Sequence, residues 1–168
     1  PVILQSRVPI RDEDTAVSME DTLARDAALL LPEAIQLIEK NACAFRDQDG
    51  SQATFAPKLT KELLRIDWNT HVRQIHDLIR GVLSWSAAFT LVRGRMLKIY
   101  GASVFETREE HEKPGEILEA ADHGILVAAK TGSLRIEELQ LEGKARLSCD
   151  EFLRGHPLAA GGMLGTEL

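Results

Sequence analysis

The chain has 168 residues, 44% hydrophobic and 27% charged, an ordinary composition for a globular protein long enough to bury a core. It has no apolar run near the about 20 residues of a membrane-spanning helix. Cys43 and Cys149 lack C-x-x-C spacing, which argues against a disulfide framework and a zinc site and suits a reducing cytosol. The net charge is −6, and residues 1–55 carry −5 of it. The remainder is near neutral, which permits a basic face without predicting one.

The first forty residues predict one strand followed by one helix. Residues 2–8 are rich in aliphatic and β-branched side chains, which favour a strand. The spacing Ser18-x-x-Asp21 resembles a capping box at the start of a helix that runs to Lys40. Pro32 lies within this helix and is expected to kink or divide it. A strand and a helix cannot bury their apolar faces alone, so they pack on the rest of the chain or belong to a larger domain.

A second helix is predicted over residues 69–82. Its apolar side chains recur at helical spacing, which places them on one face. Asn69 precedes this pattern and is expected to cap the helix. Trp68 and Trp85 are both expected in the core. The apolar positions are Val72, Ile75, Ile79 and Val82.

The remainder of the chain predicts short strands separated by turns. Arg93-Gly94-Arg95 and Thr131-Gly132 are typical of turns, and residues 106–114 are expected to form an acidic loop. With no helix between successive strands, the fold class is mainly β (α+β), a small antiparallel barrel with a leading helix. Ser148-x-x-Glu151 predicts a final short helix over 149–154. The strands are predicted at 87–92, 96–104, 115–119, 124–129 and 133–141.

Several motifs resemble the methionyl-tRNA formyltransferase family. The resemblance runs from P-V-I-L-Q at Pro1, through A-P-K-L-T-K-E at Ala56 and R-I-D-W at Arg65, to Leu164-Gly165. Its most specific part is G-K-x-R-x-S-x-x-E-F-L-R-G-H over residues 143–156. One departure is W-S-A-A at 85–88, where the family usually has W-P-G-A.

The resemblance implies a domain organisation. Residues 1–40 would be the last strand and helix of the formyltransferase catalytic domain, 41–62 a linker, and 63–168 an OB-like tRNA-binding domain. The family's catalytic residues would lie upstream of Pro1, so the chain is expected to be a fragment with no catalytic residue.

The resemblance also implies an activity for the whole enzyme, which is cytoplasmic and acts in translation initiation. It would transfer a formyl group from formyltetrahydrofolate to the amino group of initiator methionyl-tRNA. No cofactor, metal or membrane is expected for this chain, whose partners would be that tRNA and the N-terminal catalytic domain. The histidines are expected to be structural or solvated, because His71 and His76 diverge around a helix and the other three lie in separate turns.

Basic residues are the candidate tRNA-binding groups. They would act by neutralising phosphates and releasing counterions, which favours recognition of tRNA shape and backbone. The candidates are Lys58, Lys61, Arg65, Arg73, Arg80, Arg93, Arg95, Lys98, Lys144 and Arg146.

Two alternatives stay open from the sequence. The chain could be the barrel of a sugar-nucleotide formyltransferase, in which it serves packing rather than RNA. It could also be a non-RNA interaction module, which an exposed apolar patch with dispersed charges would favour.

Overall fold

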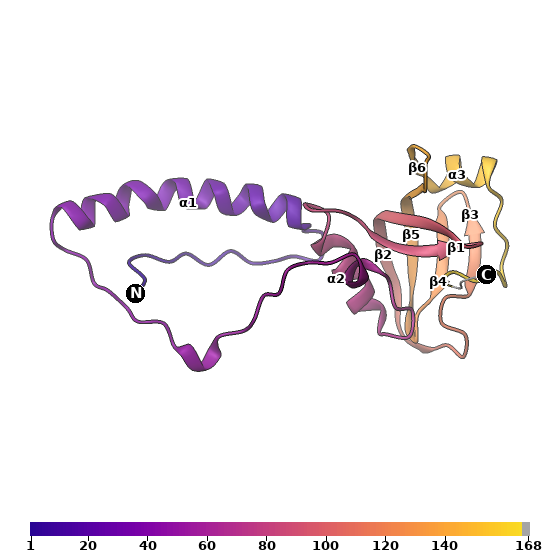
Figure 1. Ribbon diagram of the computed structural model, residues 1–168, viewed down its shortest axis with the longest axis horizontal. Coiled ribbons are helices and arrows are strands. Elements are labelled where there is room, and N and C mark those ends of the chain that lie inside the picture. Colours follow the sequence, from indigo (N-terminus) through magenta and orange to yellow (C-terminus); the bar gives the residue numbers. More distant parts are fainter. Residues whose placement is uncertain (166–168) are drawn as a thin grey trace. The chain divides into compact units, whose positions relative to one another are not determined.

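The computed structural model describes residues 1–165, and these divide into two compact units, with the boundary between Lys58 and Leu59. Figure 1 shows the helices and strands of both units in chain order by colour. Across residues 1–165, no helix is both long and apolar enough to cross a membrane.

The first unit contains one long helix, α1 (Ala16–Glu39), and a short 3-10 helix, η1 (Gly50–Gln52). The predicted strand at 2–8 is wrong: the segment forms only an isolated bridge in which the Val2 and Arg46 backbones exchange hydrogen bonds of 2.8 and 3.0 Å. Over the rest of its length the segment pairs with no other strand of residues 1–165, and aliphatic composition alone cannot supply a pairing partner.

Helix α1 begins three residues earlier than the sequence predicts. Its N-cap is Thr15, whose side chain accepts from the Ser18 N–H while the Ser18 hydroxyl accepts from the Thr15 N–H. Ser18 is therefore the third residue of the helix, and its hydroxyl takes the place of the usual Glu or Gln in the capping box. Pro32 lies inside α1 without dividing it.

Helix α1 contains no buried residue. Large apolar side chains along it are instead about half exposed or more, including Leu23 at 50%, Leu29 at 77% and Leu31 at 60%. A helix with this much exposed apolar surface gains little from its own unit.

The second unit is an antiparallel sheet with helices packed on it. The strands follow the order β1-β2-β5-β4-β3. Strand β6 also pairs with β5, at residues 138–140, which follow the residues 133–136 that pair with β4. This confirms the predicted mainly β, antiparallel architecture with a leading helix, and the sheet is open rather than a fully closed barrel. The elements are η2 (Glu62–Leu64), α2 (Val72–Gly81), β1 (Ala88–Val92), β2 (Arg95–Glu110), β3 (Ile117–Ala121), β4 (Gly124–Ala128), β5 (Thr131–Leu141), β6 (Arg146–Ser148) and α3 (Cys149–Gly155).

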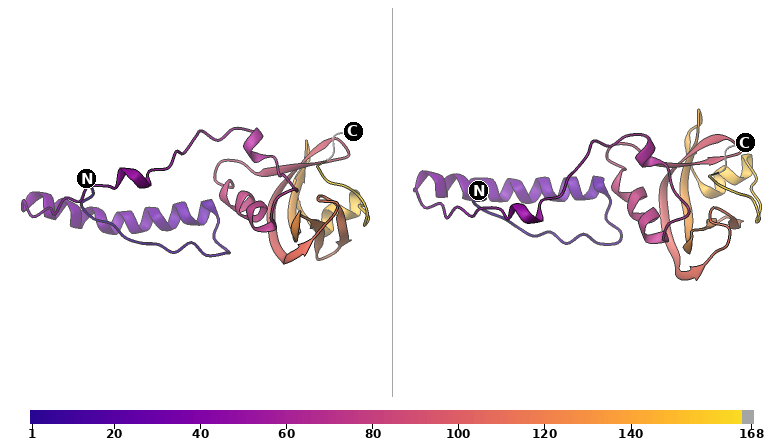
Figure 2. Two further views of the ribbon diagram at one scale, coloured as in Figure 1. Left: turned by 90° about the horizontal axis from the view of Figure 1, so that it is seen from below. Right: turned by 60° about the horizontal axis from the view of Figure 1, so that its bottom comes forward.

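The core of the second unit lies between the sheet and its helices. Val72, Ile75 and Ile79 of α2 are at most 2% exposed, as the predicted apolar face requires, and Phe152 of α3 joins the same cluster. Figure 2 shows α2 and α3 on separate sides of this unit. Trp68 is also buried, but Trp85 is 52% exposed in the loop after α2. The prediction of Trp85 in the core is therefore wrong.

The cap of α2 also differs from the prediction. Nδ1 of His71 accepts from the N–H of Arg73 at 3.1 Å, which makes His71 the N-cap. Asn69 instead belongs to the preceding turn, where its N–H donates to a carboxylate oxygen of Asp67 at 2.9 Å. Asn is by type a stronger N-cap residue than His, which is why the sequence predicts Asn69. The Asx turn at Asp67 places Asn69 before the helix, so it cannot occupy the cap position.

The strand boundaries show where local sequence misled. Strand β2 runs to Glu110, through part of the predicted acidic loop, because Glu106 and Glu110 pair with Ser133 and Thr131 of β5. Thr131 and Gly132 lie in β5, directly after the turn. The β1–β2 turn is as expected: Arg93 and Gly94 have φ of 50° and 73°, the positive values that a tight hairpin uses. Strand β6, only three residues long, was not predicted.

The sheet is open between β1 and β3, and the segment 161–165 spans this opening. The N–H groups of Ile117 and Leu164 donate to Gly162 and Gly115 carbonyls, both at 2.8 Å. On the other side, the Gly165 N–H donates to the Leu91 carbonyl at 2.8 Å. The segment therefore satisfies backbone groups at both free edges, which would otherwise be open to pairing with another chain.

Gly132 marks a close approach between β5 and its surroundings. Its φ is +85°, and a Cβ at this position would come within 2.4 Å of the Glu106 carbonyl oxygen and 2.5 Å of a Val72 methyl. Gly143 has a φ of +73° but nothing within 4 Å of an added Cβ. The positive φ favours glycine at both positions. Of the two, only Gly132 also lacks the space for a Cβ atom.

Candidate functional site

The outer face of the second unit carries a row of polar and aromatic side chains. Phe89 of β1 pairs with Lys98 of β2, Lys98 with Gln140 of β5, and Gln140 with Arg146 of β6. Residues directly opposite in antiparallel strands point to the same side of a sheet. Leu97, which alternates with Lys98 along β2, is fully buried. Lys98, Gln140 and Arg146 therefore face away from the core, whereas Phe89 is partly buried against it.

Tyr100 and Glu138 hold Arg146 in place within this row. The Arg146 guanidinium carbon lies 4.2 Å from the centre of the Tyr100 ring, a cation–π distance. One guanidinium nitrogen donates to a Glu138 carboxylate oxygen at 2.5 Å, and this bond raises the pKa of Arg146. The Tyr100 hydroxyl in turn donates to the Gln140 side-chain carbonyl at 2.9 Å. The Tyr100 ring, the Gln140 amide and the Arg146–Glu138 ion pair thus form one connected group.

The turns at the end of these strands add two further cations. Arg95 donates from its guanidinium to the Glu142 carbonyl at 2.9 Å, and the Gln140 side-chain amide donates to the Lys144 carbonyl at 2.7 Å. These contacts fix the β5–β6 turn against the start of β2. They enclose a cleft of about 200 Å³ lined by Met96, Lys98, Gln140, Glu142 and Gly143.

We call Arg95, Lys98, Lys144 and Arg146 the hairpin cluster. Four of the ten predicted binding residues are thus brought to one end of the β2–β5–β6 sheet. Within residues 1–165, no hydrogen bond or ion pair engages the ammonium groups of Lys98 and Lys144. These two groups are available to an anionic ligand.

The linker candidates lie elsewhere. Lys58 is the last residue of the first unit. Lys61 is exposed at the N-cap of η2. Arg65 directs its guanidinium to the Gly165 carbonyl at 3.4 Å. Arg65 therefore connects the two ends of the second unit, which is a structural role.

The remaining candidates are dispersed and partly engaged. Arg73 and Arg80 lie on α2, where Arg80 forms an ion pair with Asp77 at 2.8 Å and its side chain is 21% exposed. Arg93, in the β1–β2 turn, donates to the Pro157 carbonyl at 3.1 Å. Arg93 therefore ties this turn to the segment after α3.

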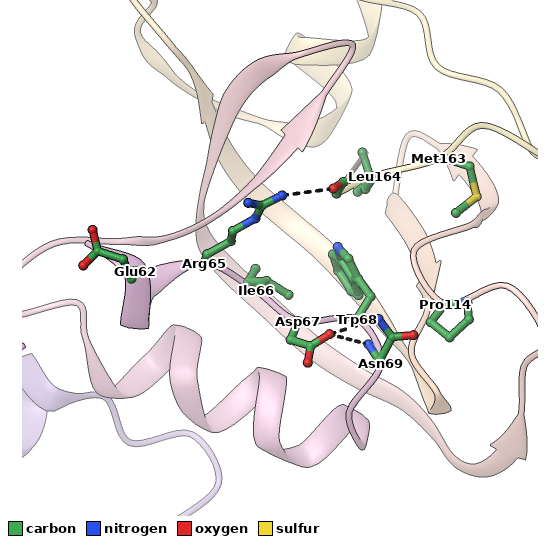
Figure 3. A pocket seen from close by; sticks show the side chains of 10 residues that line it. Glu62, Arg65, Ile66, Asp67, Trp68, Asn69, Pro114, Met163 and Leu164 are labelled. Atoms are coloured by element: carbon green, nitrogen blue, oxygen red, sulfur yellow. Dashed lines mark hydrogen bonds between the residues drawn. The ribbon is translucent and has the colours of Figure 1, made fainter. Parts of the chain in front are cut away.

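The R-I-D-W motif lines a larger cleft of about 500 Å³, which also includes Pro114 and Met163 (Figure 3). Trp68 forms its wall, and its indole N–H donates to the buried Thr90 hydroxyl at 3.0 Å. A Cβ on Gly165 would lie 3.1 Å from the Trp68 ring. The R-I-D-W motif and the Leu164-Gly165 segment therefore pack against each other. This packing accounts for the presence of both motifs without a bound ligand.

The described residues offer no sign of metal or nucleophile chemistry. Residues 1–165 hold no group of three or more His, Cys, Asp or Glu side chains that could bind a metal ion. Burial raises the pKa of the Cys149 thiol to about 11, and its sulfur donates to the Ile136 carbonyl at 3.0 Å. A buried thiol with a raised pKa is a poor nucleophile.

Tyr100 and Gln140 are site residues that sequence reasoning missed. The signal was present in part, because Lys98 and Tyr100 alternate with the buried Leu97 and Ile99 along one predicted strand. Alternation identifies the outer face, but only the register shows that Gln140 and Arg146 lie beside them.

The comparisons with known families and proteins cover nearly the whole chain. Residues 58–157 match the family described as formyl transferase, C-terminal domain. Proteins named methionyl-tRNA formyltransferase are 39% identical over 164 residues in Alkaliphilus oremlandii and 37% identical over 166 residues in Desulforamulus reducens. These matches cover 98% and 99% of this chain but 53% and 52% of the relatives. The chain therefore spans about half the length of the curated relatives it matches.

Solved structures share the fold. A variant of HypX from Aquifex aeolicus has a TM-score of 0.61 at 20% identity, with 87% of this chain and 27% of that chain covered. HypX from the same organism in complex with tetrahydrofolic acid has a TM-score of 0.52 at 21% identity, with 73% and 22% covered.

Proposed function

The chain belongs to the formyl transferase family, whose C-terminal domain its residues 58–157 match, and from this membership we propose that it is the C-terminal, tRNA-binding part of a methionyl-tRNA formyltransferase. The whole protein would transfer a formyl group from formyltetrahydrofolate to the amino group of initiator methionyl-tRNA. It would do so in the cytoplasm, at the start of protein synthesis. The names of the relatives support this choice over a sugar-nucleotide formyltransferase.

The domain organisation belongs to the same proposal. Residues 1–40 would complete a catalytic domain, 41–62 would be a linker, and 63–168, whose last three residues lie outside the described part, would be the tRNA-binding domain. The exposed apolar side chains of α1, such as Leu29 and Leu31, support its packing on that catalytic domain. The chain itself would bind tRNA and catalyse nothing.

The hairpin cluster is the observation that carries the binding role. Lys98 and Lys144 present ammonium groups that have no hydrogen-bond or ion-pair partner among residues 1–165, and both lie at the same end of one sheet. Ammonium groups in such a position neutralise phosphates and release counterions, which gives affinity that falls steeply with salt. The backbone contacts of Arg95 and Gln140 hold the two turns in register, so these charges are placed before RNA arrives.

A titration tests this proposal. The chain is titrated with initiator and elongator tRNA at low and moderate salt, and we expect binding that weakens with salt and favours the initiator. The double variant Lys98→Glu, Lys144→Glu should lose at least tenfold in affinity, on the order expected when two phosphate contacts become repulsive.

Lys130→Glu is the matched control. Lys130 is exposed just before β5, while the hairpin cluster lies at the other end of this 11-residue strand, about 30 Å away. Equal losses in the control and the double variant would refute the assignment to the hairpin cluster. Absence of binding to either tRNA at low salt would favour the non-RNA interaction module.

A further inference from the structure

We propose that Arg146 is a stacking platform for one unpaired nucleobase of the bound RNA, rather than a phosphate contact; this inference rests on the function proposed above. Its guanidinium lies over the Tyr100 ring at 4.2 Å. Nevertheless 49% of the Arg146 side chain is exposed. The ring thus lies against the guanidinium, and about half of the side chain remains accessible to a base.

The charge of Arg146 is already balanced. Its 2.5 Å bond to Glu138 places a carboxylate beside the guanidinium, so a phosphate approaching Arg146 also meets a negative charge. In the described part of the chain no carboxylate is bonded to Lys98 or Lys144, so these two side chains are better suited to phosphates. An arginine already paired with a carboxylate should bind a neutral aromatic base more favourably than a second anion. Its planar, delocalised guanidinium can still stack on such a base.

The platform is ordered before any ligand binds. The contacts form a chain from the Lys144 carbonyl through Gln140 to Tyr100, and from Tyr100 through Arg146 to Glu138. A long arginine side chain normally loses much conformational freedom on binding. Here that loss has already occurred in the folded protein, so a stacked base would retain more of its interaction energy.

The sheet offers an internal comparison. Arg135 of β5 lies over Phe105 at 4.8 Å, but its side chain is only 18% exposed and lies 3.9 Å from a Glu119 carboxylate oxygen. Arg135 therefore presents much less of its guanidinium to solvent. Arg135→Lys is the control in which an arginine–aromatic stack is lost at a site that we do not expect to receive a base.

The experiment separates stacking from charge. The 168-residue chain is titrated with a short single-stranded RNA and with an abasic strand that has the same number of phosphates. We expect the chain to prefer the RNA by about tenfold, since one stacked base contributes about this much. Arg146→Lys keeps the charge but removes the plane, so it should abolish the preference while affinity for the abasic strand stays unchanged. Arg135→Lys should keep the preference.

The outcomes distinguish the two proposals. If the wild-type chain binds neither tRNA nor either strand, the proposed function fails and this inference fails with it. If the wild-type chain binds tRNA but does not distinguish the RNA from the abasic strand, or if Arg146→Lys keeps the full preference, only the stacking role is overturned. Tyr100→Phe keeps the ring beneath Arg146 but removes the hydroxyl bond to Gln140, so it should reduce the preference without abolishing it. This variant is a second test should Arg146→Lys alter the turn.

Discussion

The Trp68–Thr90 hydrogen bond should be a strong determinant of stability in the second unit. The two residues are 4% and 1% exposed, and the indole N–H donates to the hydroxyl at 3.0 Å. Trp68→Phe would leave the Thr90 hydroxyl without its donor, at a cost of about 1–3 kcal/mol. The smaller ring would also leave space in the core, for about 1 kcal/mol more. We expect a total loss of about 2–4 kcal/mol.

The partner substitution turns this estimate into a coupling measurement. Thr90→Val removes the acceptor with little change in volume and leaves the indole N–H unpaired, so it should also cost about 1–3 kcal/mol. In the double variant neither group remains to be satisfied. Its loss should therefore be smaller than the sum of the single losses by about 1–2 kcal/mol.

Urea unfolding followed by far-ultraviolet circular dichroism measures all four proteins, because this signal comes mainly from the backbone and is present in each variant. Strict additivity of the two single losses would show that the hydrogen bond contributes nothing to stability and would contradict this prediction.

Two further predictions concern stability. Gly132→Ala should destabilise the second unit by at least about 2 kcal/mol, because it adds a steric clash to an unfavourable φ, whereas Gly143→Ala should cost only about 1 kcal/mol; thermal melts that rank them equally would contradict this. The raised pKa of Cys149, about 11 against 9.0 for an unburied thiol, means that the unfolded chain loses its proton first as pH rises. Stability should therefore be unaffected below about pH 9 and fall between pH 9 and 11, a fall that Cys149→Ala should reduce in urea titrations. In native protein at pH 8, a thiol reagent should modify Cys43 and spare Cys149; rapid labelling of both would show that Cys149 is accessible.

Local sequence was sufficient wherever a local interaction decides the structure. The helix after Ser148 forms because the side chains of Ser148 and Glu151 cap one another's backbone. The Arg93-Gly94 turn forms because two residues with positive φ suit a tight hairpin. Both were predictable from a few adjacent residues.

The sequence did not predict the features that depend on contacts between residues far apart in the chain. The extent of β2 depends on its pairing with β5, and β6 exists because Leu147 meets Leu139 across the sheet. The exposure of Trp85 likewise depends on the packing around the loop. For the site, Lys98, Lys144 and Arg146 were predicted individually. Their convergence could not be, because it depends on strand register rather than on spacing along the chain.

The closure of the sheet by segment 161–165 has a consequence for folding kinetics. Arg65 and Gly165 are 100 positions apart, so the contact between them forms a loop that contains almost the entire second unit. Closing so large a loop costs entropy that later contacts must repay, and folds dominated by such contacts are slow. The closing segment should therefore dock late, after the β2–β5 pairing. Until it docks, β1 and β3 expose free edges, and it is in this interval that the unit is most prone to pair with another copy of itself.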